Sequence, residues 1–113
     1  MTRERMKVIK IVSELLSYYF MHHIIDVQID VQYGKEHVMI TIVGQISKKP
    51  DDVGELYDVL NAERQVEYED YYWSLLGEHR NYSELNLLGS LVDQGEVTYE
   101  DEHLTVKVYR ARD

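Results

Sequence analysis

Apolar residues recur at helical spacing from about Arg3 to His23, because positions three and four apart share one face of a helix. They cover an arc of roughly 200°, about twice the stripe that one packing surface needs. We therefore expect this first helix to have two apolar neighbours. One flank carries Ile9, Val12, Leu16, Tyr19 and Phe20, and the adjacent flank carries Val8, Ile11, Leu15 and Tyr18.

The period then changes to two, which is typical of half-buried strands. Residues 26–32 alternate apolar and polar side chains. The chain returns over residues 38–43, where Val38, Ile40 and Ile42 alternate with Met39, Thr41 and Val43. Gly34 and Lys35 are suited to a two-residue turn between them, in which the glycine supplies a positive φ. This turn predicts three apolar cross-strand pairs: Val31 with Val38, Ile29 with Ile40, and Val27 with Ile42.

The second half of the chain combines helical and strand patterns. Asp51 or Asp52 is suited to cap a short helix, and a second helical pattern follows it within an insert at residues 51–79. Beyond the insert, a helix is expected to end at Gly95. A second hairpin closes the chain after it.

The remaining boundaries complete the predicted fold. Ser83 is expected to cap the last helix, and the loop of the second hairpin is expected to run from Glu100 to His103. Residues 1–113 then form a single α+β domain, a two-layer sandwich whose four-stranded sheet of two hairpins has helices on one face. The opposite sheet face is expected to be mostly polar, with Asp26, Gln28, Asp30, Thr41, Thr98, Thr105 and Lys107.

Composition narrows the class of protein. The 113 residues carry a net charge of −9, from 12 Lys and Arg against 21 Asp and Glu, which disfavours nucleic acid as a partner. The chain has no cysteine, so a disulfide framework and a zinc-thiolate site are excluded. We find no apolar run of about 20 residues and no secretory signal, and we expect a cytoplasmic protein without membrane attachment.

Two segments and the order of elements resemble a known family. The segments are SELLSYYFMHH (Ser13–His23) and LLGSLVDQGEV (Leu87–Val97). The chain resembles the histidine-kinase-like ATPase (GHKL) superfamily, especially the anti-sigma-factor serine kinases, from about Ile9 to Tyr109. The resemblance implies a Glu-x-x-x-Asn helix, an adenine-binding Asp after a hairpin, and a Gly-rich turn that wraps phosphate.

The family's ligand-binding residues are largely replaced in this chain. Glu14 matches the Glu that prepares a water for attack, but the Asn that holds Mg²⁺ falls at Tyr18, whose phenol is a poor ligand for that ion. The adenine-binding Asp falls at about Gly44. The Gly-rich turn falls at Asn81–Asn86, which lacks glycine and places Glu84 against a triphosphate. We therefore expect no cofactor and no metal, with Glu14 a solvated residue of the helix face.

Other candidate sites carry weaker signals. His22 and His23 are adjacent on a helix, so their side chains point about 100° apart and do not chelate one ion. The aromatic segment after the first short helix includes Tyr71 and Trp73, which are candidates for a protein-binding surface because Tyr and Trp are enriched at interface hot spots. Two alternatives stay open for these aromatics, an ordinary core with its surface and a small-ligand pocket.

These observations predict a non-catalytic regulatory or protein-interaction domain, on a degenerate kinase-like ATPase fold, that binds an unknown regulatory protein. One alternative is an ATP-dependent serine kinase of the anti-sigma type, in which Glu14 is catalytic. Another is a small-molecule sensor that uses the vacated pocket near Tyr18, Gly44 and Ser83. Fold resemblance does not choose between them.

A homodimer through the first helix is also expected. The flank with Val8, Ile11, Leu15 and Tyr18 would face water in a monomer, as a contiguous apolar patch of a kind that soluble monomers avoid. A two-fold partner with the same patch would cover it. The alternative is that the helices of the insert fold over this flank.

Overall fold

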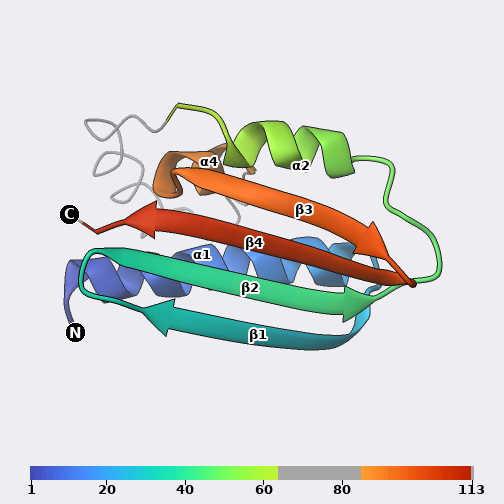
Figure 1. Ribbon diagram of the computed structural model, residues 1–113, viewed down its shortest axis with the longest axis horizontal. Helices are drawn as coiled ribbons and strands as arrows, with labels where there is room; N and C mark the ends of the chain where they lie inside the picture. The colour runs from blue at the N-terminus through green and yellow to red at the C-terminus, as the bar shows by residue number, and fades with distance from the viewer. Residues whose placement is uncertain (64–84, 113) are drawn as a thin grey trace.

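The computed structural model describes residues 1–63 and 85–112 (Figure 1). The helices are α1 (Arg3–Met21), α2 (Val53–Leu60) and α4 (Leu85–Leu91). The strands are β1 (Ile25–Tyr33), β2 (His37–Gln45), β3 (Gln94–Glu100) and β4 (His103–Ala111). Residues 64–79 of the predicted insert, with Tyr71 and Trp73, and the predicted cap Ser83 lie outside the described residues.

The four strands form one antiparallel sheet in the order β1-β2-β4-β3. Figure 1 shows α1 crossing behind β2 and β4, with α2 and α4 near β3. One core joins the buried side chains of the three helices to Val38, Ile40 and Ile42 of β2 and to Leu104, Val106 and Val108 of β4. The predicted α+β sandwich of two hairpins, with helices on one face, is confirmed. The opposite face of the sheet is open and mostly polar, as expected.

The register of the first hairpin differs from the prediction. Ile29 and Val31 each lie opposite a residue two positions beyond the predicted partner, so that Ile29 faces Ile42 and Val31 faces Ile40. The predicted pair of Val27 with Ile42 is not formed. The turn is the reason, because Gly34 N–H donates to His37 C=O at 2.9 Å and the turn is centred one residue later than predicted. Gly34 does not adopt the predicted positive φ. Since the shift is by two residues, the same side chains still face the core.

Helix α1 ends in a Schellman-type cap. Ile24 N–H donates to Tyr19 C=O at 3.0 Å, and His23 N–H donates to Phe20 C=O at 3.1 Å, which are the two bonds of this motif. His23 has a φ of 60°, the left-handed conformation that glycine usually supplies there. The helix therefore ends at Met21, two residues before its predicted end, and the chain turns at once into β1.

Gly95 lies within β3 and not at the end of the preceding helix, where it was predicted. A Cβ at this position would lie 2.7 Å from Leu60 Cβ, so the glycine allows α2 to pack closely against the strand. Asn61 holds the main chain of Gly95, because its Nδ2 donates to Gly95 C=O (2.9 Å) and its Oδ1 accepts from Gly95 N–H (3.0 Å). The outer edge of β3 is therefore occupied at this residue.

The flank of α1 that was expected to face water is buried, so that expectation is wrong. Its four residues, Val8, Ile11, Leu15 and Tyr18, all belong to the core. The physical reason is the placement of α1, which contacts β1, β2 and α4 and so has neighbours on both sides of this flank. These side chains are not available for an interface between folded chains.

Candidate functional site

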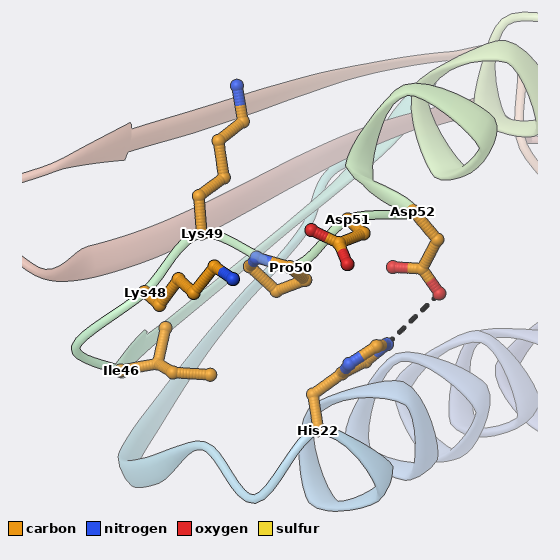
Figure 2. A pocket seen from close by; sticks show the side chains of 7 residues that line it. All are labelled: His22, Ile46, Lys48, Lys49, Pro50, Asp51 and Asp52. Carbon is orange, nitrogen blue, oxygen red and sulfur yellow. Dashed lines mark hydrogen bonds and ion pairs between the residues drawn. The ribbon is translucent and has the colours of Figure 1, made fainter.

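Asp52 links the start of α2 to the end of α1. It occupies the N-cap position of α2, as the sequence suggested, but its side chain makes no capping hydrogen bond. The carboxylate instead accepts a hydrogen bond from the Tyr18 hydroxyl at 2.7 Å and lies 3.1 Å from His22 Nε2, a contact drawn in Figure 2. The sequence did not predict this pairing, which follows from burial of a hydroxyl that needs an acceptor.

Two neighbouring phenols on α1 are held in their neutral form. Burial raises the pKa of Tyr18, and the hydrogen bond to Asp52 raises it further. Burial also raises the pKa of Tyr19, whose hydroxyl lies 3.0 Å from the Ile42 carbonyl oxygen and 2.9 Å from that of Leu104. Each phenol is therefore a hydrogen-bond donor within the fold and not a nucleophile or a general base.

A shallow cavity of about 340 Å³ opens beside the contact between His22 and Asp52. Its lining residues are His22, Ile46, Lys48, Lys49, Pro50, Asp51 and Asp52. Figure 2 shows the Lys49 side chain extending away from His22, so the charged groups do not converge on one point. The lining offers hydrogen bonds to a small polar molecule, but it groups no nucleophile with a base and an oxyanion donor.

Glu14, the residue that matches the family's water-activating Glu, is buried and not solvated as expected. Its carboxylate pairs with Lys10 Nζ at 2.7 Å, and 8% of the Glu14 side chain is exposed. The expectation is wrong because α1 contacts α4, so the face of α1 directed away from β1 is covered as well. The carboxylate has a structural partner within its own helix.

The position expected to correspond to the adenine-binding Asp is filled by protein. Gly44 is buried, and a Cβ there would lie 2.9 Å from Tyr19 Cδ2 and would also collide with Ile24 Cγ2. Tyr18, at the expected Mg²⁺ position, is buried and hydrogen-bonded to Asp52. The segment 81–84, at the expected phosphate turn, lies outside the described residues.

Exposed apolar side chains occur on both α1 and β1, which contact each other. We call the surface that they form the α1–β1 surface, and its four exposed members are Ile9 (51% exposed), Phe20 (59%), Ile29 (39%) and Val31 (43%). The half-buried Val12, Leu16 and Val27 pack beside them on the core. Sequence periodicity identified this flank of α1 as apolar, and the structure exposes its Ile9 and Phe20 but buries its Tyr19.

The contact between Arg5 and Tyr33 fixes how α1 lies along β1. The Arg5 guanidinium carbon is 4.2 Å from the centre of the Tyr33 ring. The helix and the strand run in opposite directions in Figure 1. Four helical residues advance about 6 Å and two strand residues about 7 Å, so we expect Ile9 at about the level of Val31 along β1.

The comparisons with known proteins leave the family open. No protein-family model and no curated protein sequence matches the chain. No group of three or more His, Cys, Asp or Glu side chains in residues 1–63 and 85–112 is arranged to hold a metal ion. Among the same residues, no helix is long and apolar enough to cross a membrane.

Proposed function

We propose that the chain is a non-catalytic, regulatory protein-interaction domain on a degenerate kinase-like ATPase fold whose nucleotide site is lost. The observation that carries this proposal is the filled position at Gly44. Tyr19 and Ile24 occupy the space where the family resemblance places an adenine-binding group. An Asp side chain at position 44 would have to displace two core side chains, and close-packed interiors resist such displacement.

The α1–β1 surface supports an interaction role. Its exposed apolar side chains come from two elements that lie side by side, and contiguous apolar patches of this kind are typical of protein-binding sites. We propose that the partner of this surface is a protein. The net charge of −9 argues against nucleic acid as a partner.

A thermal-shift experiment tests the loss of the nucleotide site. The midpoint of unfolding is measured with Mg-ATP, Mg-ADP and a metabolite library, because a ligand that binds only the native state raises the midpoint by mass action. We expect no rise with millimolar Mg-ATP or Mg-ADP. A clear rise with Mg-ATP would overturn the proposal in favour of the serine-kinase alternative.

The Glu14→Gln variant is the matched control for that outcome. In a kinase that uses Glu14, the variant keeps nucleotide binding and loses phosphate transfer, since the amide cannot accept the proton of the attacking hydroxyl group. In an interaction domain, wild type and variant both lack any Mg-ATP response. A rise with a metabolite, without one for Mg-ATP, would favour the small-molecule sensor, and the cavity at His22 and Asp52 is then the place to examine.

A further inference from the structure

The two edges of the sheet differ in how they are protected. At one edge, Asn61 holds the N–H and the C=O of Gly95 in β3. At the other edge, β1 is nine residues long, and no further strand pairs with it among the described residues. A β-bulge interrupts β1 between Ile25 and Gln28, and pairing is regular from there to Tyr33. A regular, unpaired edge is a template for another strand.

The backbone groups that point to this free edge can be assigned. Gly34 and His37 form a hydrogen-bonded pair, and hydrogen-bonded and non-hydrogen-bonded pairs alternate along an antiparallel ladder. The even-numbered residues of β1 therefore bond to β2. The N–H and C=O groups of Ile29, Val31 and Tyr33 point outward, and the side chains of Ile29 and Val31 add an exposed apolar face.

The sequence of β1 is complementary to itself in an antiparallel, two-fold pairing. When the axis passes through Val31, Val31 meets its own copy, Ile29 meets Tyr33, and Asp30 meets Gln32. A carboxylate then faces an amide donor, and the apolar side chains share one face. An axis at Asp30 would place two carboxylates directly opposite each other, which is destabilising. The Val31 register also lies wholly within the regular part of the strand.

The helix beside the strand extends the same surface. Helix α1 packs along β1, so a two-fold axis through Val31 brings both copies of Ile9, expected at about the level of Val31, to one side of the joined sheets. Their exposed side chains then flank the apolar strip formed by Ile29 and Val31 of each copy. Burial of these side chains adds a hydrophobic contribution to the main-chain hydrogen bonds.

We propose that the partner at the α1–β1 surface is a second copy of this chain, and that β1 pairs with β1 around Val31 to form one continuous eight-stranded sheet. The proposal rests on the interaction role proposed above and names its partner. It also replaces the buried flank of α1 with an exposed strand edge as the interface of the homodimer.

The sharpest test is a proline at the centre of the pairing. Val31→Pro removes an outward N–H and leaves the bonds to β2 in place, since proline is tolerated where an edge N–H faces solvent. Val31→Thr is the matched control, because it keeps both the N–H and a β-branched shape. Light scattering and sedimentation are measured at high micromolar concentration. We expect dimers for wild type and Val31→Thr, and a folded Val31→Pro monomer with dimerisation weakened at least about tenfold.

Two results would overturn the proposal. One is a wild-type monomer at high micromolar concentration, which would leave the edge for an extended peptide from another protein. The other is a Val31→Pro variant that dimerises as well as wild type, which would place the interface elsewhere.

Hydrogen exchange on the wild-type protein tests the same pairing without the Val31→Pro variant, and so it applies even when that variant does not fold. The amides of Ile29, Val31 and Tyr33 should exchange more slowly as the protein concentration rises, since pairing protects them. Exchange that is independent of concentration contradicts the proposal. The two proposals fail in different experiments. Stabilisation by Mg-ATP would contradict the interaction role, whereas a monomeric wild type would contradict the pairing of β1 with β1.

Discussion

Arg110 and Glu4, which lie 106 positions apart in the sequence, form a two-pronged ion pair. Arg110 Nε and Nη2 donate to the two carboxylate oxygens of Glu4 at 2.8 and 2.9 Å, and Nη1 donates to the Leu91 carbonyl at 2.8 Å. Only 1% of the Arg110 side chain is exposed. The guanidinium therefore fastens the start of α1 to the end of β4 and to the end of α4.

Breaking this pair from one side is expected to destabilise the fold strongly. Glu4→Leu should lower the free energy of unfolding by about 3 kcal/mol, because it removes the carboxylate that makes two hydrogen bonds with a buried guanidinium. The double variant Glu4→Leu/Arg110→Met should recover most of that loss, since apolar replacements for a buried pair are often neutral. Urea unfolding of the single and double variants measures both. Equal losses in the two variants would contradict this account.

Stability is expected to fall at alkaline pH because of Tyr18 and Tyr19. Burial raises the pKa of each phenol above its ordinary value of 10.0 in the folded state, so the unfolded chain ionises first. The free energy of unfolding should be unaffected by these groups below about pH 9, and above pH 10 it should fall by up to about 1.4 kcal/mol per pH unit for each phenol.

Phenylalanine variants identify the source of this slope. Tyr18→Phe and Tyr19→Phe should each remove one phenol's share of the slope above pH 10. Each should also cost about 1 kcal/mol at neutral pH, from the lost hydrogen bond. Urea unfolding at a series of pH values gives both quantities. Unchanged slopes in both variants would mean that these phenols do not control alkaline unfolding.

His23→Gly is expected to stabilise the protein. His23 holds a left-handed φ at the end of α1, a conformation that costs a residue with a Cβ about 1–2 kcal/mol. Glycine removes this strain but is more flexible in the unfolded chain, so the net gain should be about 1 kcal/mol, or about 4–8 °C in Tm. Glu102 also has a left-handed φ, of 61°, so Glu102→Gly should stabilise the protein for the same reason. A lower Tm for His23→Gly would show that its side chain stabilises the fold.

The two hydrogen bonds between Asn61 and Gly95 should make a measurable contribution to the free energy of unfolding. Asn61→Ala leaves the N–H and C=O of Gly95 without their side-chain partner, at a cost of about 1–3 kcal/mol. Asn61→Asp keeps an acceptor for the N–H, but its ionised carboxylate has no donor for the C=O of Gly95. Protonation at low pH restores an O–H donor, so the loss of stability should be smaller there than at neutral pH. Calorimetry at two pH values separates the cases.

Local patterns in the sequence predict the layers of this fold but not which surfaces meet. Alternation in β1 and β2 depends only on the period of two, so the core face is correct even though the register shifts by two residues. The register depends on the turn beside Gly34, which is closed by the hydrogen bond from Gly34 to His37 and is contacted by Arg112 from the other end of the chain. Periodicity alone cannot supply that information.

The choice between the two apolar flanks of α1 illustrates the same limit. Both flanks are apolar in sequence, and the difference comes from contacts with elements distant along the chain. The pairing of Tyr18 with Asp52, across 34 positions, is likewise a tertiary contact. Asp51 and Asp52 suggest a helix cap in the sequence. In the structure, the buried Tyr18 hydroxyl donates a hydrogen bond to Asp52, so this carboxylate points toward α1.

The clamp between Asn61 and Gly95 also limits how far strand pairing can spread. In polymer terms, growth of a fibril by repeated addition of strands needs two reactive edges on every copy. A pair joined through β1 would present β3 at each of its two ends, and there the N–H and the C=O of Gly95 are already bonded to Asn61. A strand that adds to β3 would have to displace this side chain first.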